Sequence, residues 1–482
     1  MRNLSIPFAT VAWIILLAAL VVSLAAALEL RGLYADGVGY LFYMIKNEGF
    51  ALFEPSRLSV QILQQWPTVM GMASGIHDAA TLSVIHCISL QLLPLALVIA
   101  CYLVLPKDRK NWFFFPLLHY LAGSMGAAFP SIVEGPVATA YFWLVLYSIL
   151  FRTETRSSLA LVALLALPLA YAHEVMIFLA PILALAAVWR ASLVESTWQR
   201  IGFWLLDSWF AVVVGVQIGF VLNPRDPGNR ASFINNFIGL NWLIDSGDIN
   251  VSVALGILAI LSLLVIWLML LIGRESTWVK VCSLLVTAAF GLVVLLVLTR
   301  TLNSIHLFRP WMQFAARNHP AFVSAPLALL ALTSLRRPRL QTIWATATNQ
   351  IILLFLTVGV LGWHAVVTSY WADYLTTYRE MLESHQGLVS YEEMVSSLPQ
   401  KQHERFEKMT WGWTNPLLSL ILSPQGKVST MIANPSTHVG WQPFDPADPD
   451  TLPKSVWFDT SQYQRVLKQA KIEGNVYSKQ NP

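Results

Sequence analysis

The stretch IPFATVAWIILLAALVVSLAAA at residues 6–27, followed at once by LELRGLYADGVGY at 28–40, decides the class of fold. About 20 consecutive apolar residues are needed for a helix to cross the hydrocarbon core of a bilayer, and residues 6–27 meet that length. No small-residue cleavage site precedes a soluble region, so we interpret this run as an uncleaved first span. Asp36 is the first acid well beyond it, and a carboxylate there is expected at the water boundary.

The rest of the chain repeats this apolar pattern. Hydrophobic residues make up 56% of the sequence, charged residues only 12%, and the mean hydropathy is +0.58. Such a composition excludes an ordinary soluble domain and predicts an all-α polytopic membrane protein. We predict about eleven transmembrane helices. Their expected bounds are about 6–27, 80–105, 112–130, 135–151, 158–173, 175–190, 201–222, 251–273, 279–299, 320–335 and 343–367.

The distribution of Lys and Arg predicts the orientation, because short loops rich in these residues stay in the cytoplasm. With the N-terminus cytoplasmic, the short connections on that side carry most of the basic residues outside the tail: Arg2, Lys107, Arg109, Lys110, Arg152, Arg156, Arg190, Arg200, Arg274, Lys280, Arg336, Arg337 and Arg339. An odd number of spans then places the C-terminus outside. The pair 158–173 and 175–190 is short, and a single re-entrant unit is the alternative; the later orientation is the same either way.

These spans divide the chain into two expected parts. Residues 1–367 form a transmembrane domain with an amphipathic first outer loop, 28–79, in which apolar residues at helical spacing suggest two interfacial helices. After about residue 368 the sequence turns polar and rich in NP, DP and LP pairs, which predicts a small extracytoplasmic C-terminal domain, 368–482. Its first part should form helices that split near Gly387, and TNPLLSLILS should dock on the membrane part.

Candidate functional side chains gather on the predicted outer side. Asp36 is the preferred catalytic base and Glu134, alone between two apolar runs, is a second catalytic candidate, since an acid at that depth needs a partner or a function. For substrate binding we predict Arg57, which can pair with phosphate through its planar guanidinium, and His77, which can relay a proton. His173 and Glu174 interrupt an apolar run. The remaining candidates are His306, Arg309 and Arg317, a cationic rim for a phosphate or diphosphate.

Each candidate also has a purely structural reading. Asp-Gly is an ordinary turn signal, a histidine at a helix end is common, and Trp and Phe in the outer loops serve as interfacial anchors more often than as sugar platforms. The three cysteines, Cys87, Cys101 and Cys282, fall inside apolar runs and are expected to pack in the core. Zinc-type clusters, Walker loops, HExxH helices and GxSxG elbows do not occur in the sequence, no metal ligands are assigned, and the scattered charge of +4 gives no support to nucleic-acid binding.

The arrangement resembles the GT-C superfamily of polyprenyl-phosphate-dependent integral membrane glycosyltransferases. The likeness lies in a cytoplasmic N-terminus, a long first outer loop, Asp36 just after the first span, many spans and an outer C-terminal domain. Members often carry paired acids in that loop, whereas here Gly37 follows Asp36.

The resemblance implies a bacterial inner (plasma) membrane enzyme of the cell envelope. Asp36 would deprotonate an acceptor hydroxyl of a glycan, lipid or protein, which attacks a polyprenyl-phosphate-linked sugar donor with inversion. No cofactor is assigned, and a divalent metal ion is left open. A lipid-linked glycan polymerase or ligase is the nearest alternative, and a non-enzymatic transporter or scaffold for envelope polysaccharide is another. Membrane lipids are expected partners in every case.

Overall fold

The structure is a computed structural model. It describes residues 7–125, 134–152, 155–224, 313–335, 347–396, 398–410, 412–433, 443–453 and 457–472, with the strand residues 244–245 and 248–249 and the single positions 277 and 281. The predicted span 251–273 lies outside the described residues, and of the span 279–299 only Val281 is described.

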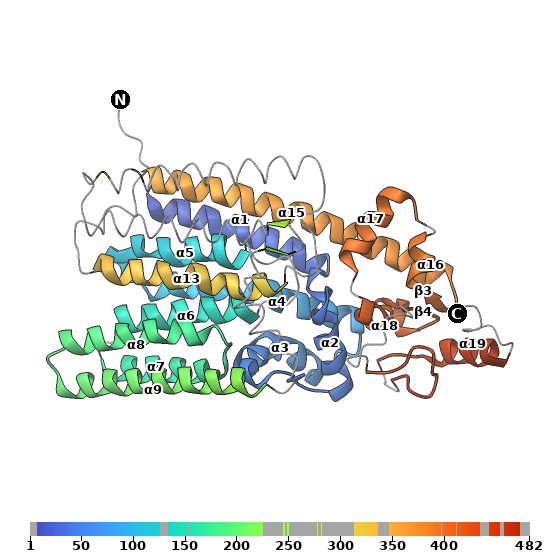
Figure 1. Cartoon of the computed structure of the whole chain (residues 1–482), viewed down its shortest axis with the longest axis horizontal. Coiled ribbons are helices and arrows are strands. Elements are labelled where there is room, and N and C mark those ends of the chain that lie inside the picture. Colours follow the sequence, from blue (N-terminus) through green and yellow to red (C-terminus); the bar gives the residue numbers. More distant parts are fainter. Residues whose placement is uncertain are drawn as a thin grey trace, which may run out of the picture.

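A bundle of long helices forms the main body of the molecule (Figure 1). Six helices in the described ranges are long and apolar enough to cross a membrane: α1 (Phe8–Leu28), α4 (Ala79–Val104), α6 (Glu134–Phe151), α8 (Met176–Leu193), α9 (Thr197–Leu222) and α15 (Ala347–Ser384), the last judged over its part from Asn349. Two shorter apolar stretches, Arg156–Tyr171 and Val323–Leu335, accompany them. This confirms a helical membrane protein, while the total of eleven spans stays a prediction.

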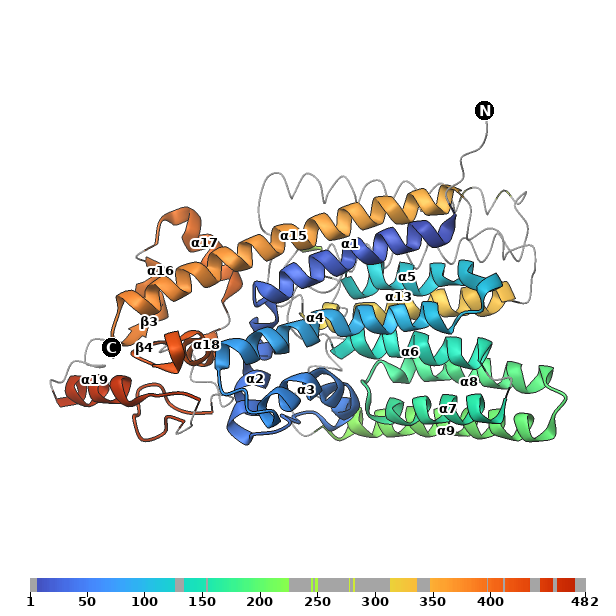
Figure 2. The same ribbon diagram turned by 180° about the vertical axis from the view of Figure 1, so that it is seen from behind.

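Helix α6 is the centre of the bundle. It packs against α4, α8 and α13 (Gln313–Leu335), and every residue in its apolar window is buried. Its polar residues Glu134, Thr139 and Ser148 are all buried, and polar side chains within a span are satisfied by protein and not by lipid, which favours this central place. On one side of α6, α4 packs against α1, and α1 packs against α15. On the other side, α8 packs against α9, and α9 packs against α7 (Arg156–Ala166). Figure 2 shows the same order from behind.

The pair 158–173 and 175–190 forms two antiparallel passes. Helix α7 continues into the 3-10 helix η5 (Leu167–Tyr171), and α8 returns alongside α9. The start of α7 lies at one end of the bundle, where Arg156 stands over the ring of Trp198 at a distance of 5.3 Å. The end of η5 lies at the other end, where Gln217 donates to the carbonyl of Ala170 at 2.9 Å. The pair therefore forms two antiparallel helical stretches between the two ends of the bundle, and the choice between two spans and a re-entrant unit stays a prediction.

The predicted span 112–130 is not a regular helix over its described part. The chain forms η3 (Lys107–Phe113), then α5 (Phe114–His119), then a π-helical turn, η4 (Tyr120–Met125). Lys110 and Arg152 hold the preceding turn by donating to the carbonyls of Tyr102 and Val104, the last acceptors of α4. Cations at a helix C-terminus satisfy carbonyls that lack a helical partner. We call this the basic end of the bundle.

The opposite end carries the first loop. The chain here forms η1 (Arg31–Leu33), α2 (Asp36–Asn47), η2 (Pro55–Arg57) and α3 (Leu58–Ala73). Helices α2 and α3 lie beyond the ends of α6, α8 and α9, and α3 packs alongside α4; we call this the α2 end (Figure 1). The two α-helices, α2 and α3, match the two helices predicted in residues 28–79, and their placement along a membrane surface stays a prediction.

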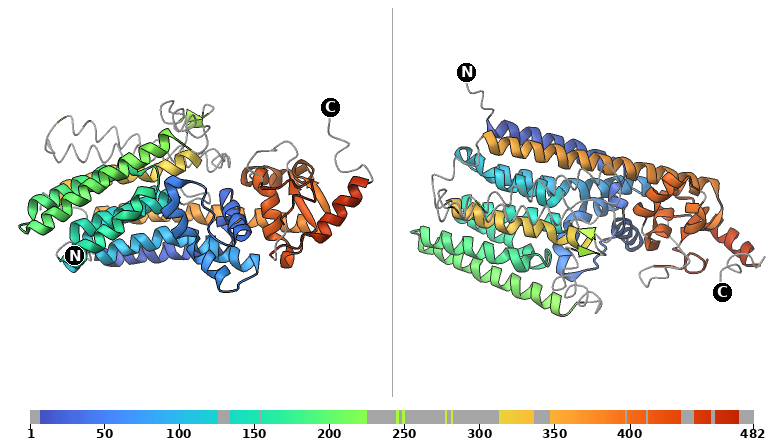
Figure 3. Two further views of the ribbon diagram at one scale, coloured as in Figure 1. Left: turned by 90° about the horizontal axis from the view of Figure 1, so that it is seen from below. Right: turned by 45° about the horizontal axis from the view of Figure 1, so that its top comes forward.

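The C-terminal segment also lies at the α2 end (Figure 3). Helix α15 runs unbroken through the expected boundary at 367/368 to Ser384 and leaves the bundle. There follow β3 (Gly387–Ser390), α16 (Tyr391–Ser396), α17 (Gln400–Met409), η8 (Gly412–Thr414), α18 (Asn415–Leu422), η9 (Pro424–Gly426), β4 (Thr430–Ala433) and α19 (Ser461–Ile472). Strands β3 and β4 pair in parallel, and β1 (Ile244–Asp245) pairs antiparallel with β2 (Asp248–Ile249). The helices do separate next to Gly387, as predicted.

This segment shares a hydrophobic core with the first loop. Val38, Leu41 and Phe42 of α2 belong to the same buried cluster as Trp371 and Tyr378 of α15. Helix α18, the predicted docking patch TNPLLSLILS, contacts α2 and α4. The described residues between 368 and 472 thus share a common core with the loop after α1.

Candidate functional site

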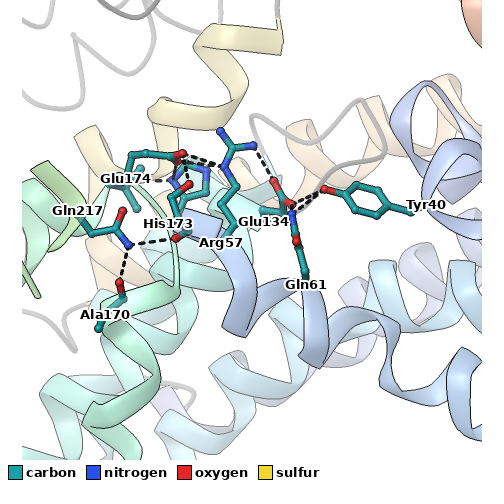
Figure 4. A network of polar contacts seen from close by, with 10 residues as sticks. Tyr40, Arg57, Gln61, Glu134, Ala170, His173, Glu174 and Gln217 are labelled. Atoms are coloured by element: carbon teal, nitrogen blue, oxygen red, sulfur yellow. Dashed lines mark hydrogen bonds and ion pairs between the residues drawn. The ribbon is translucent and has the colours of Figure 1, made fainter. Parts of the chain in front are cut away.

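Four of the predicted site residues meet in one buried polar cluster at the α2 end (Figure 4). Arg57 lies between two glutamates: its Nη1 donates to Glu134 Oε2 at 2.9 Å, and its Nε donates to Glu174 Oε2 at 3.0 Å. His173 Nδ1 is 3.1 Å from the same Glu174 oxygen. These residues come from η2, the start of α6 and the turn before α8. The fold therefore unites three segments that are distant in sequence.

Glu134 is the most buried acid of the cluster, with 1% of its side chain exposed. Besides Arg57, its carboxylate accepts from Tyr40 at 2.8 Å and from Gln61 Nε2 at 3.0 Å. It is also the first residue of α6, where the free N–H groups of the first helical turn favour a negative charge. The acid that the sequence left alone between apolar runs thus has a complete set of donors.

Glu174 is held in a similar way. Ser56 donates to its Oε1 at 2.6 Å, beside the Arg57 contact. Burial by itself would raise the pKa of Glu174, but the charges of Arg57 and His173 and the two hydrogen-bond donors outweigh it, so the pKa lies well below its usual value. Burial likewise opposes the charge of Arg57, yet Glu174 and Glu134 keep the pKa of Arg57 well above its ordinary value. The ion pair between Arg57 and Glu174 is therefore formed at neutral pH.

A glutamine in α9 anchors the surrounding backbone. Gln217 Nε2 donates to the carbonyl oxygens of Ser56, at 3.0 Å, and Ala170, at 2.9 Å. This ties η2, which carries Arg57, to the end of η5, which leads into His173. Gln217 is fully buried in an otherwise apolar part of its helix. Its role is to position the two segments that supply the charges.

Asp36 lies next to this cluster, at the first position of α2 and one helical turn before Tyr40. Its charge helps to raise the pKa of both Tyr34 and Tyr40, although burial is the larger cause for each. The residue before it, Ala35, has φ of 51° and ψ of −127°. A non-glycine residue with positive φ costs about 1–3 kcal/mol and persists only where the surrounding packing imposes it. Ala35 is buried, and this backbone bend starts α2 at Asp36.

The other predicted site residues do not join the cluster in the described structure. His77 is exposed, and its ring packs 4.9 Å from Trp457, so it joins the first loop to the C-terminal segment. His306 and Arg309 lie outside the described residues. Arg317 lies in α13, and its side chain is likewise outside what the structure describes. Within the described ranges, no three His, Cys, Asp or Glu side chains gather so as to hold a metal ion.

Sequence reasoning missed Tyr40, Gln61, Ser56 and Gln217. Tyr40 has a signal in the sequence, because it follows Asp36 by four residues and so shares its helix face. Gln61 and Ser56 flank Arg57 on the same loop. Gln217 is a lone amide in an apolar span, which is a polar group that needs partners in a membrane. None of these signals says which distant residue is the partner.

Comparison of the chain with known proteins found no relative. No protein-family model, no curated protein and no solved structure matches the chain.

Proposed function

We propose that this protein is an inverting glycosyltransferase of the GT-C type. It moves a sugar from a polyprenyl-phosphate donor to a glycan, lipid or protein acceptor at the outer face of a membrane, with Asp36 as the general base. The observation that carries the proposal is the place of Asp36: directly after the first span, behind the bent backbone of Ala35, and one turn from the Arg57 cluster.

The chemistry requires a base and a cation close together. The carboxylate of Asp36 takes the proton of the acceptor hydroxyl, whose oxygen forms a bond to the anomeric carbon while the bond from that carbon to the phosphate oxygen breaks. The electron pair leaves with the polyprenyl phosphate. Arg57 supports this step because both of its ion pairs use Nε and Nη1, and its other terminal nitrogen points away from the two glutamates (Figure 4). Those remaining N–H groups suit a phosphate oxygen.

Glu134 and Glu174 have a second task in this proposal. They fix the plane of the Arg57 guanidinium, so that its outward edge is held in place before a substrate arrives. Such pre-organised donors stabilise developing charge without the cost of reorientation. Arg309 and Arg317 remain predicted contributors of further positive charge.

The orientation follows from the basic end. Lys110, Arg152 and Arg156 lie there, opposite the α2 end, and basic residues near span ends favour the cytoplasm. The N-terminus is then cytoplasmic, and Asp36, the cluster and residues 368–482 are extracytoplasmic. A site at a bundle end, and not halfway along it, suits an enzyme better than a transporter, whose binding site is usually near the bilayer midplane.

One observation favours a second candidate, a polymerase or ligase of lipid-linked glycans. Such an enzyme would rely on arginine and histidine, and Arg57 and His173 share the Glu174 carboxylate. Here His173 would act as the base and Asp36 would be dispensable.

The test compares Asp36→Asn with Glu48→Gln, an exposed acid at the other end of α2. Purified protein in lipid nanodiscs is given a polyprenyl-phosphate-linked radiolabelled hexose and envelope extract as acceptor, and binding of undecaprenyl phosphate is measured separately. We expect Asp36→Asn to lower transfer by about 10²–10⁴-fold with lipid-phosphate binding retained, and Glu48→Gln to match wild type. Full transfer by Asp36→Asn would contradict the proposal. Loss in His173→Gln alone would favour the ligase.

A further inference from the structure

Helix α3 is amphipathic in the reverse of the usual sense. Its buried side carries Gln61, Gln64, Gln65 and Thr68, each at most 4% exposed. Its outward side carries Leu63, Trp66 and Met70, which are 39%, 55% and 41% exposed. A surface helix of a water-soluble domain turns its apolar stripe inward. In α3 the polar stripe faces protein and the apolar stripe faces away from it.

Hydrogen bonds fix α3 in this rotation. Gln65 accepts from the backbone N–H of Ala51 at 2.7 Å and donates to its carbonyl at 2.8 Å. Gln61 donates to Glu134, and Ser89 of α4 donates to the carbonyl of Gln64 at 2.6 Å. Rolling α3 over would break all of these bonds and leave buried polar groups without partners, at about 1–3 kcal/mol each. The exposed apolar side is therefore a feature of the folded protein.

The outward side of α3 continues the apolar surface of the membrane helices. Ser59, at the start of α3, donates to the carbonyl of Pro168 in η5 at 2.7 Å. On η5 itself Leu167 and Tyr171 are 51% and 42% exposed, and Leu222 at the end of α9 is 50% exposed. These residues lie where the helices leave the bundle at the α2 end. Helix α3 contacts η5, and η5 contacts α9. The exposed apolar side chains of these three elements therefore form one continuous surface at the α2 end.

We propose that the outward side of α3, formed by Leu63, Trp66 and Met70 with the neighbouring Leu52, binds the boundary between lipid headgroups and acyl chains. Leu52 is 42% exposed, and the ring of Phe50 packs 6.2 Å from that of Trp66. Trp is enriched at this boundary because one edge of its indole is apolar and its N–H is polar. The bilayer is the occupant favoured here because the same surface is continuous with that of the membrane-crossing helices. This inference stands independently of the proposed glycosyl transfer.

Gln61, on the inner side of α3, donates to Glu134, and Glu134 pairs with Arg57. A shift of α3 in the lipid would therefore change a contact of the polar cluster. A lipid-borne substrate diffusing in the same leaflet would meet α3 beside the cluster. The helix is thus both a wall of the polar cluster and a contact with the bilayer.

The experiment places single spin labels on the full-length protein in nanodiscs, in a background with Cys87, Cys101 and Cys282 replaced by Ala. Labels at Leu63→Cys and Met70→Cys are compared with a lipid control, Val358→Cys, which is 74% exposed on α15, and a water control, Glu383→Cys, exposed at the end of α15. We expect the ratio of collision rates with oxygen to those with a water-soluble nickel chelate to resemble the lipid control.

Two results would overturn the inference. A nickel collision rate equal to that of the water control would place the outward side in solvent. Low rates with both reagents would show that protein, such as a second copy of the chain, covers it. If the cysteine-free background does not fold, the native chain is reconstituted with a diazirine-bearing phosphatidylcholine. Photo-crosslinks on the peptide 58–73 are then expected, and their absence beside crosslinks on α9 would refute the inference.

Discussion

Replacing Arg57 with Met should destabilise the folded protein strongly, because it removes the cation from a cluster of two carboxylates. Glu134 keeps only 1% of its side chain exposed, and Glu174 keeps 16%. Breaking a buried ion pair by removing one partner costs about 3–5 kcal/mol, since the remaining charge stays buried without compensation. Two carboxylates are affected here, so we expect a loss in the upper part of this range. Tyr40, Gln61 and Ser56 would still donate to the two acids and would limit the loss.

The assay is equilibrium unfolding in mixed micelles, with the midpoint temperature as a second measurement. The matched control is the triple variant Arg57→Met, Glu134→Gln and Glu174→Gln, which keeps the shape of the cluster and removes all of its charge. It should recover more than half of the loss, because an uncharged cluster no longer buries unpaired charge. If Arg57→Met alone unfolds within about 1 kcal/mol of wild type, the cluster is hydrated like a surface pair, and the reasoning is refuted.

Three further outcomes are expected. The pKa of Glu174 is depressed below its usual 4.5 in the folded protein, so its stabilisation is complete above that pH and is lost on acidification; Glu174→Gln should flatten the decline in stability from pH 5 downward in acid titrations. Gly32→Ala would place a methyl group 2.9 Å from Cys87 Sγ and 3.1 Å from the backbone Cα of Cys87 and should cost about 1–3 kcal/mol, measured by unfolding, whereas Gly219→Ala, with no neighbour within 4 Å, should not destabilise. A single cysteine at Asp108, on the basic end, should react with a membrane-impermeant maleimide only in inverted vesicles; reaction in intact cells would reverse the proposed orientation.

The sequence predicted the membrane class and the ends of several helices with good accuracy. The run 6–27 became α1 (Phe8–Leu28), and 80–105 became α4 (Ala79–Val104). Apolar length determines such spans locally, because a backbone in hydrocarbon must satisfy its own hydrogen bonds within one helix. At 112–130 the described part is helical but irregular, because α5 gives way to the π-helical turn η4. Composition does not show where a helix changes its hydrogen-bonding pattern.

The sequence also predicted that four site residues lie on one side of the membrane: Arg57, Glu134, His173 and Glu174. In the structure these four residues lie together at the α2 end, in agreement with that prediction. Counting spans is enough for this, since alternate loops return to the same face. It could not show that Arg57 pairs with both glutamates, and it offered each residue as a separate candidate. Those pairings join residues 77 and 117 positions apart, and only helix packing brings them within 4 Å.

The sequence by itself therefore predicted the environment of each segment. The long apolar helices are expected in hydrocarbon, and the acids and cations between them are expected at the boundary with water. The tertiary structure alone decided which charges neutralise one another, that α3 turns its glutamines inward, and that the described part of residues 368–472 shares a core with α2. The physical reason is the range of the interactions. Transfer from water to lipid is a property of each side chain and its neighbours in sequence, whereas ion pairs and packing depend on contacts that form only when distant segments meet.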